Sequence, residues 1–220
     1  MNIQQRTKEV IRSLNLMSDI MMNFVFNDDP EAVQELLNPI FERDDIQVIS
    51  CKSQSLIQNT YGKDARLDIL AKDNQGKLYD IEMQQEDRYA PPERARYYSS
   101  MLDNRYISKN WEIKDKKNPW YSMPETYVIF FTRKDHFHAN LPAYYIDRFI
   151  RNLNYRPFSD REHIIYVNCS FKDDNSPIGQ LIHDLVQTDY TEITNKVLKN
   201  RVKYFIEGEG EKICAKLFRN

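Results

Sequence analysis

The sequence predicts a mixed α/β fold with a helical C-terminus, because helical and strand-like patterns of apolar residues alternate along the chain. Apolar residues recur every three to four positions over residues 4–26 and again over 30–41, as on the buried side of a helix. Three strand-like segments follow. A near-continuous apolar run at 126–132 is then typical of a central strand that is covered on both faces.

The composition is that of a folded domain. Hydrophobic residues make up 41% of the 220 residues and charged residues 29%, which supports a buried core and argues against wholesale disorder. The length suits one large domain, and no repeat or long linker divides the chain. We therefore expect a single domain over 1–220, with a core of about 17–170 and a helical extension of about 177–207.

Two helices are expected before the first strand. The segment 4–26 would bury a stripe of apolar side chains: Val10, Ile11, Leu14, Met17, Ile20 and Met21. The second helix begins at Asp28-Asp29-Pro30-Glu31, where an acidic cap precedes a proline in the first turn. It would carry five apolar residues inward, although Pro39 lies close to its end: Ala32, Val33, Leu36, Leu37 and Ile40.

Strands are expected at 46–50, 65–71 and 78–84. The last two flank Asp73-Asn74-Gln75-Gly76, a turn-forming cluster, so they should pair as an antiparallel hairpin. After Pro91-Pro92 a helix over 93–107 should place Arg94, Tyr97 and Tyr98 along one side. The rest of the chain is expected to hold a polar loop at 108–124, strands at 126–132, 144–150 and 163–168, and helices at about 178–187 and 191–206.

The pattern indicates a cytoplasmic protein. No apolar run is long enough to span a bilayer, and residues 1–10 lack the apolar core of a signal peptide. The cysteines, Cys51, Cys169 and Cys214, are odd in number and widely spaced. They suit buried reduced thiols better than disulfides or a metal pair.

Overall charge does not indicate nucleic-acid binding, since the formal net charge is −2. The segment 196–219 does carry seven basic residues and three acidic ones. It could contact phosphates, although an ordinary solvated helix face is the commoner explanation.

The 65–84 hairpin carries the pattern with most chemical content. With a turn centred on Gln75, Asp68 lies directly across from Glu82, and Gln84 projects from the same face as Glu82. Two like charges opposite each other are destabilising. A divalent cation between them would justify the arrangement, because Mg²⁺ prefers carboxylate oxygens and can polarise a phosphate and acidify water. The alternative is a solvated hairpin face on which these polar side chains merely occupy the outside.

At this hairpin the sequence resembles the PD-(D/E)XK nuclease superfamily, and more closely its recombination-promoting nuclease / putative transposase family. The most specific match is I-E-M-Q at 81–84, at the right distance after R-L-D-I at 66–69. The resemblance covers about 17–207. Further matching segments are 73–77, 79–84, 94–98, 124–132, 163–168 and 177–179.

The resemblance implies a restriction-endonuclease-like fold, with a mixed sheet flanked by helices on an αβββαβ core. Asp68 would match the metal-binding aspartate, Glu82 the acid of the E-x-K signature, and Gln84 would stand at the lysine position. Glutamine supplies no positive charge, so its role would be hydrogen bonding. Candidates implied for further roles are Glu35, with Glu31 weaker, as an extra acid, and Arg94, Arg96 and Tyr98 as phosphate contacts.

The implied activity is an endonuclease that hydrolyses DNA phosphodiester bonds with Mg²⁺, or with Mn²⁺, in recombination or transposition. A homodimer would suit cleavage of both strands. No residue reads a base or a 2′-hydroxyl, so RNA stays open as the substrate. The alternative is a catalytically silent module that binds nucleic acid or protein on the same fold.

Other candidate motifs are better explained by structure than by function. His136 and His138 lack a third metal ligand, and 173–175 lacks the glycine and distal glutamate of a calcium loop. His183 and Asp184 lie on a predicted helix, where a structural role is expected.

Overall fold

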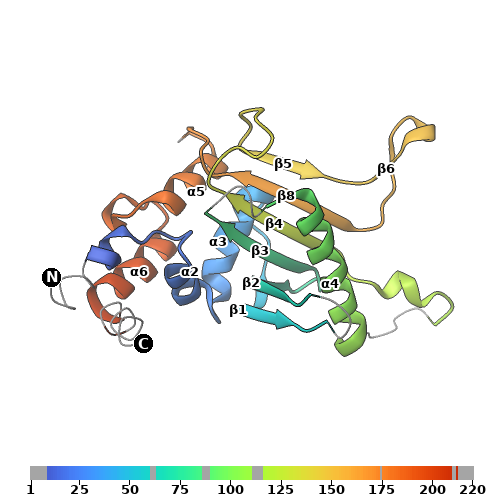
Figure 1. Ribbon diagram of the computed structural model, residues 1–220, viewed down its shortest axis with the longest axis horizontal. Coiled ribbons are helices and arrows are strands. Elements are labelled where there is room, and N and C mark those ends of the chain that lie inside the picture. The colour runs from blue at the N-terminus through green and yellow to red at the C-terminus, as the bar shows by residue number, and fades with distance from the viewer. Residues whose placement is uncertain are drawn as a thin grey trace.

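The protein is a mixed sheet with helices on both faces, as predicted (Figure 1). The computed structural model describes residues 9–59, 63–85, 90–110, 116–173, 175–209 and 212. In this part of the chain a six-stranded sheet has the order β1-β2-β3-β4-β8-β5. The strands are β1 (Val48–Ile57), β2 (Ala65–Asp73), β3 (Leu78–Gln84), β4 (Thr126–Thr132), β5 (Ala143–Ile146) and β8 (Glu162–Asn168).

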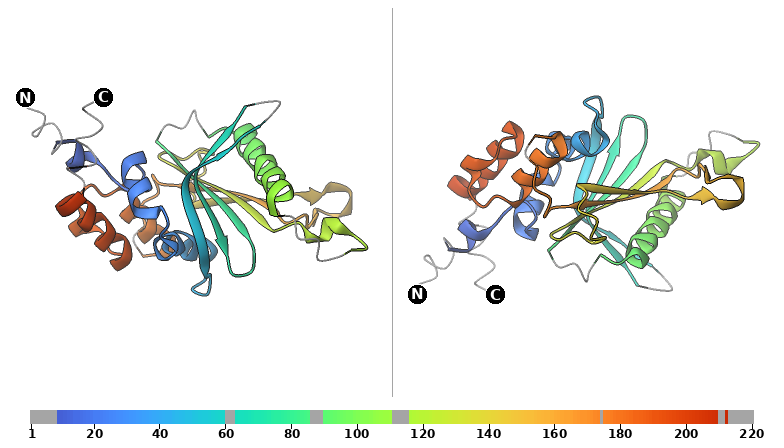
Figure 2. Two further views of the ribbon diagram at one scale, coloured as in Figure 1. Left: turned by 90° about the horizontal axis from the view of Figure 1, so that it is seen from below. Right: turned by 90° about the horizontal axis from the view of Figure 1, so that it is seen from above.

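Strand direction changes across the sheet. The pairs β1–β2, β2–β3 and β5–β8 are antiparallel, whereas β3–β4 and β4–β8 are parallel. A second sheet pairs β6 (Phe149–Ile150) with β7 (Arg156–Pro157). This short hairpin projects from the end of the molecule opposite to the C-terminal helices (Figures 1 and 2).

The helices are divided unequally between the two faces of the sheet (Figure 2). One face is covered by α2 (Asp19–Phe26), α3 (Pro30–Phe41), α5 (Pro177–Val186) and α6 (Lys196–Tyr204), and the other by α4 (Pro92–Asn110). Short helical turns include η2 (Pro119–Ser122), η3 (Arg151–Leu153), η4 (Tyr190–Glu192) and η5 (Phe205–Glu209). The chain order α3, β1, β2, β3, α4, β4 is the αβββαβ order implied by the resemblance.

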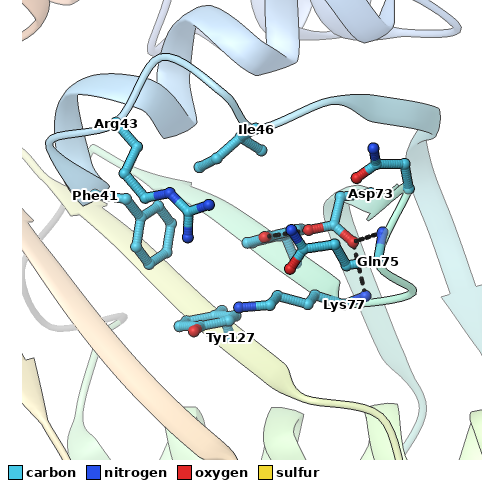
Figure 3. Close-up of a pocket in the computed structure, with 9 residues that line it drawn as sticks. Phe41, Arg43, Ile46, Asp73, Gln75, Lys77 and Tyr127 are labelled. Carbon is cyan, nitrogen blue, oxygen red and sulfur yellow. Dashed lines mark hydrogen bonds between the residues drawn. The ribbon is translucent and has the colours of Figure 1, made fainter.

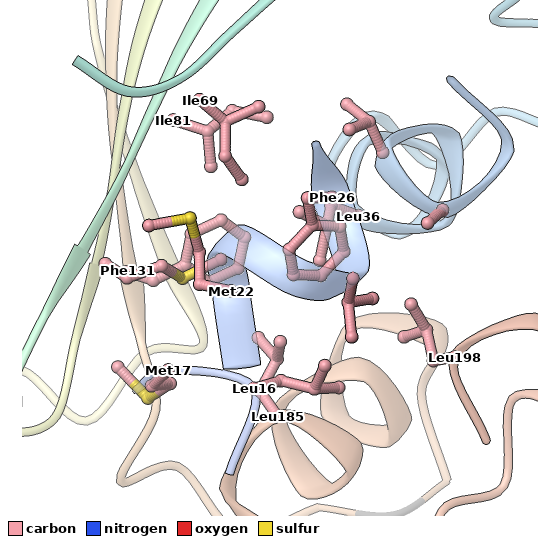
Figure 4. Packing of buried hydrophobic residues seen from close by; sticks show 14 of the residues in the cluster. Leu16, Met17, Met22, Phe26, Leu36, Ile69, Ile81, Phe131, Leu185 and Leu198 are labelled. Atoms are coloured by element: carbon pink, nitrogen blue, oxygen red, sulfur yellow. The ribbon is translucent and has the colours of Figure 1, made fainter. Parts of the chain in front are cut away.

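The larger core lies between the sheet and the four-helix face. Met22 of α2 lies beside Phe131 of the sheet, Phe26 of α2 lies beside Leu36 of α3, and Leu198 of α6 lies on the side away from the sheet (Figure 4). Each of these side chains is less than 5% exposed. Burial of a side chain of this kind is worth about 1.5–3 kcal/mol, so this layer holds the sheet's position against the helices.

The N-terminal helix predicted over 4–26 is broken in the structure. Residues 9–13 are helical, and α2 begins only at Asp19; residues 4–8 lie outside the described chain. Between the two helices, Asn15 Oδ1 accepts hydrogen bonds from Met17 N (3.2 Å) and Ser18 Oγ (3.1 Å). Asparagine and serine side chains that bond nearby main chain compete with helix formation, and the apolar spacing does not reveal this competition.

The helix predicted at 30–41 is confirmed as α3. Asp29 caps it, with its carboxylate accepting from Ala32 N at 3.2 Å, and Pro30 occupies the first turn. Its five predicted inward residues are all buried: Ala32, Val33, Leu36, Leu37 and Ile40.

The first strand is longer than predicted, reaching Ile57 instead of Ser50. Its second half buries Ser53 and Ser55, small polar residues that give no apolar alternation to read. Gln54 lies in β1, where this strand pairs with β2, and has φ +51°. The regular alternation of side chains between the two faces of the sheet is interrupted at this position. Leu67 packs in the cluster beside α4, but Ile69 packs in the larger core, although both were expected on one face. A local irregularity of this kind re-aims neighbouring side chains.

The predicted hairpin between β2 and β3 is confirmed. Its register, with Ile69 opposite Ile81 and Leu70 opposite Asp80, is that of a turn centred on Gln75. Gly76 takes φ +85°, which glycine adopts without steric cost. Asp73 organises the turn by accepting from Gln75 N, Lys77 N and Tyr79 Oη at 2.9 Å each (Figure 3).

Later elements match the predictions unevenly. The strands at 126–132 and 163–168 are confirmed as β4 and β8, and β4 is buried along its whole length. The predicted strand at 144–150 is divided between β5 and β6. The predicted loop at 108–124 is wrong in part, because α4 extends to Asn110 and η2 lies within it. The last predicted helix, 191–206, is regular only over 196–204.

The structure also tests part of the predictions for the cysteines and for the basic segment 196–219. Cys51 and Cys169 are buried free thiols, as expected, and Cys214 lies outside the described residues. In the basic segment, Arg201 pairs with Asp29 at 2.6 Å and Lys199 Nζ donates to Thr191 O at 2.7 Å. These contacts favour the solvated-helix explanation for the described part of that segment. None of the described helices has the length and apolar character needed to cross a bilayer.

Candidate active site

Asp68 and Glu82 lie where β2 and β3 part. The β2–β3 ladder ends at Ile69↔Ile81, while β3 continues alongside β4 as far as Gln84. Beyond the ladder, side chains bridge the two strands. Asp68 N donates to Glu82 Oε1 at 2.9 Å, and Met83 N donates to Asp68 Oδ2 at 3.0 Å. Each carboxylate thus accepts from the main chain of the opposite strand, which fixes both side chains at the junction.

Helix α4 contributes a guanidinium to the same place. Arg94 Nη2 lies 2.8 Å from Glu82 Oε2, and Arg94 Nη1 donates to Gln84 Oε1 at 3.0 Å. Gln84 Nε2 in turn donates to Glu82 Oε2 at 3.4 Å. The guanidinium also bonds Tyr98 Oη at 2.9 Å and lies over the Tyr98 ring, 4.8 Å from its centroid. The structure therefore brings together five residues singled out from the sequence: Asp68, Glu82, Gln84, Arg94 and Tyr98.

The polar face of β3 is not solvated. Asp80 and Glu82 are both 0% exposed and Gln84 is 7% exposed, because α4 packs over this side of the sheet. The alternative of a hairpin face that merely turns polar residues to water is therefore wrong. Burying charged groups is costly unless they are paired, so this cluster requires a further explanation.

Asp80 is a member of the cluster for which the sequence predicted no role. Among the described residues, neither of its carboxylate oxygens has a hydrogen-bond donor. It lies two residues before Glu82 and one strand away from Asp68, so the D-x-E-x-Q pattern of 80–84 was the available signal. This pattern indicates a shared site only once the burial of the three side chains is known.

Burial dominates the electrostatics of the three acids. Desolvation raises the pKa of Asp68 to about 6, against the lowering effect of the Met83 N–H. Desolvation also holds the pKa values of Asp80 and Glu82 well above the usual carboxyl range, and the negative charge of Asp68 adds to both shifts. Burial therefore favours the protonated forms of these carboxyl groups in the metal-free protein.

We expect metal-free protein to lose stability as pH rises. Because the folded-state pKa of Asp68 lies above the unfolded value of about 3.9, the native state holds a proton that the unfolded chain has released. The stability is complete below that unfolded value and is lost as pH rises through about 6. The loss from this carboxyl is on the order of 3 kcal/mol.

Urea unfolding in EDTA at pH 4.5 and 7.5 measures this effect. The difference between wild type and Asp68→Asn isolates this carboxyl from the other titrating groups. A difference that does not change with pH would contradict the assigned shift.

The donor chemistry of the cluster fits a hard divalent cation. Two fully buried carboxyl groups, Asp80 and Glu82, and the half-buried Asp68 share this region with the guanidinium of Arg94. If all three carboxyl groups are ionised, Arg94 compensates one of the three negative charges. One Mg²⁺ would balance the two that remain. Carboxylate oxygens are the ligands Mg²⁺ prefers, and no N–H or O–H donor in the described part of the chain engages either oxygen of Asp80. Within the described residues, however, no three His, Cys, Asp or Glu side chains already converge around one point.

Comparison with known families decides the context of this cluster. A family model described as PD-(D/E)XK nuclease family transposase matches residues 21–174. The chain belongs to this family. No significant match was found among curated proteins or among solved structures. Membership of the PD-(D/E)XK nuclease family transposases indicates a nuclease-type function and a nucleic-acid substrate, and members of the superfamily generally use divalent metals.

Three candidates implied by the family pattern lie elsewhere. Glu35 of α3 accepts a hydrogen bond from Asn195 and lines a pocket beside α5 with Asp184, on the four-helix side of the sheet. Glu31 is exposed in the first turn of α3. Arg96 is also exposed, one residue beyond the buried Ala95 and two beyond Arg94. The helical positions that reach the PD-(D/E)XK cluster are therefore Arg94 and Tyr98.

The motifs set aside from the sequence have structural contacts. His136 stacks on Tyr166 with ring centroids 5.1 Å apart. Asp184 is 1% exposed and accepts from Thr194 N at 2.7 Å and Asn195 N at 2.8 Å. It joins α5 to the start of α6, as its expected structural role requires.

An open groove lies at the carboxyl ends of β3 and β4, where the N-terminal part of α2 meets the sheet. It has a volume of about 580 Å³ and is lined by Gln85, Arg133 and Asp19, among others. Arg133 N donates to Gln84 O at 3.1 Å, and the charge of Asp19 acts on Asp68. The groove therefore lies next to the end of β3, one residue beyond Gln84. Open α/β sheets commonly bind ligands at the carboxyl ends of their strands.

Proposed function

We propose that the protein is a Mg²⁺-dependent endonuclease that hydrolyses DNA phosphodiester bonds, with a role in recombination or transposition. The observation that carries the proposal is the placement of the half-buried Asp68 and the fully buried Glu82 at one strand junction, tied to Gln84 and Arg94. A protein that only needed a polar surface would not bury these acids together. Family membership supplies the reaction class.

Each residue has a distinct proposed role. Asp68 and Glu82 would hold the cation, Mg²⁺ or Mn²⁺, which when bound supplies the Lewis acidity that polarises a phosphate and acidifies water. Gln84 would orient the attacking water by hydrogen bonding, since its amide cannot act as an acid. Arg94 carries the positive charge that the signature lysine would otherwise bring, and its guanidinium suits a phosphate oxygen.

The groove is the proposed path of the nucleic-acid strand. We expect Arg133→Ala to weaken DNA binding a few-fold at low salt and to reduce the slope of log K against log salt by about 1. Fluorescence anisotropy with a labelled duplex in EDTA measures both quantities.

Arg156→Ala is the matched control, because this exposed arginine lies on the hairpin at the opposite end of the molecule. Equal effects of the two substitutions would contradict the proposed path.

The substrate class is tested with labelled DNA and RNA oligonucleotides, each incubated with Mg²⁺ or with EDTA. The proposal predicts cleavage of DNA only in Mg²⁺. Preferential cleavage of RNA would keep the site and change the substrate. Salt-dependent binding of DNA with no metal-stimulated product would support a catalytically silent binding module instead.

A homodimer is also proposed, since one site cuts one strand. On linear DNA with both ends labelled, concerted cutting of both strands supports a dimer, and accumulation of nicked product supports a monomer.

A further inference from the structure

Asp80 is buried with no N–H or O–H donor beside its carboxylate among the described residues, and its polar neighbour is the Glu82 carboxyl, whose side-chain hydrogen bond lowers the pKa of Asp80. Asp80 lies in the middle of β3, opposite Leu70 of β2 and Val128 of β4, and its side chain is 0% exposed. An unpartnered buried carboxylate costs several kcal/mol, and a β-strand at this position could hold a valine or a leucine instead. The burial of Asp80 is explained if its carboxylate binds a ligand or if its carboxyl group is protonated.

Asp80 belongs electrostatically to the pair at the strand junction. The charge of Asp68 acts on Asp80, and the charges of both act on Glu82. Main-chain N–H groups occupy one oxygen of Asp68 and one of Glu82, and Arg94 occupies the other oxygen of Glu82. In the described part of the chain no N–H or O–H donor engages either oxygen of Asp80, and the side chain with which it interacts is the Glu82 carboxyl. Asp80 therefore has the most to offer a cation that enters the cluster.

We propose that Asp80 is a third acidic ligand of the divalent cation, beside Asp68 and Glu82. The inference rests on the proposed function, because it concerns the same cation. A third carboxylate makes the charge of the cluster, together with Arg94, equal and opposite to that of one Mg²⁺. A site with more acidic ligands binds a cation more tightly. A third carboxylate would therefore raise the cation affinity of this site, which lacks the signature lysine.

The competing explanation is that Asp80 keeps a proton and serves as a neutral packing residue. The two explanations diverge for Asp80→Asn. Asparagine reproduces the shape and neutrality of a protonated carboxyl, but it cannot supply an anionic ligand. A ligand role predicts a large loss of metal affinity, and a packing role predicts little change.

The test is calorimetric titration of Mn²⁺ into metal-free full-length protein at pH 7.5, in the absence of nucleic acid. We expect Asp80→Asn to weaken Mn²⁺ binding at least about tenfold, which corresponds to about 1.4 kcal/mol. Asp68→Asn should also weaken it, and Glu35→Gln should bind as wild type. In EDTA, Asp80→Asn should melt at or above the wild-type temperature, because it removes an unpartnered charge.

The outcomes separate this inference from the proposed function. If Asp80→Asn binds Mn²⁺ as tightly as wild type while Asp68→Asn does not, the third ligand is overturned and the two-acid site stands. If wild type itself binds no Mn²⁺, the cation site and the proposed function fall together. Should Asp80→Asn fail to fold, the same titration with Asp80→Ser decides between the same results.

Discussion

Asp68→Asn is expected to lower the rate of Mg²⁺-dependent DNA cleavage by on the order of 1000-fold, while Glu35→Gln leaves the rate unchanged. The substitution removes one anionic ligand of the proposed cation site, and Lewis-acid stabilisation of the transition state is worth several kcal/mol. Asparagine can still accept the hydrogen bond that Met83 N makes to Asp68, so the strand junction should persist. Glu35 is a suitable control because it is an acid of the same fold whose contact is Asn195.

The rates are best measured in single-turnover cleavage of a labelled duplex, with circular dichroism to verify folding. An Asp68→Asn variant that cuts at the wild-type rate would remove Asp68 from the site. Loss of cleavage in Glu35→Gln would instead return the helix-borne acid to the catalytic centre.

Arg94→Met is expected to lower the free energy of unfolding by about 3 kcal/mol in EDTA at pH 7.5. Glu82 is fully buried and Arg94 Nη2 lies 2.8 Å from it, so removing the guanidinium leaves a buried charge without compensation. The Arg94 side chain is 27% exposed, which places the expected loss at the lower end for a buried ion pair. The loss should shrink at acidic pH, because Glu82 can then take up a proton.

Urea unfolding of a double-mutant cycle measures this pair. Glu82→Gln in the Arg94→Met background should recover most of the lost stability, since the uncompensated charge is gone. Arg96→Met, an exposed substitution of the same kind two residues away, should change stability by less than about 0.5 kcal/mol. Equal losses for Arg94→Met and Arg96→Met would show that the ion pair does not stabilise the fold.

The parts of the fold that were predictable are those set by local chemistry. The β2–β3 hairpin follows from the turn residues around Gln75 and the period-two pattern on either side, and α3 follows from Asp29 and Pro30. The break before α2 was not predictable from apolar spacing, because it depends on side-chain bonds of Asn15. The second half of β1 was missed because its buried residues include serines.

Most of the residues that form the candidate site could be predicted from the sequence, but their burial could not. The register that sets Asp68 against Glu82 can be derived from the turn, and Gln84 follows from strand periodicity. Burial cannot be derived locally, because it depends on α4 folding back over β3 to bring Arg94 to Glu82. Asp80 was passed over for this reason, and Glu35 was retained because the position of the C-terminal helices beside α3 is equally non-local.

The most direct test of the account is incubation of supercoiled plasmid with wild type and with Glu82→Gln, each with Mg²⁺ or with EDTA. We expect nicked or linear plasmid with wild type in Mg²⁺, and neither product in the other three reactions. Cleavage by Glu82→Gln at the wild-type rate, or by wild type in EDTA, would contradict the assignment of the buried cluster as a metal-dependent nuclease site.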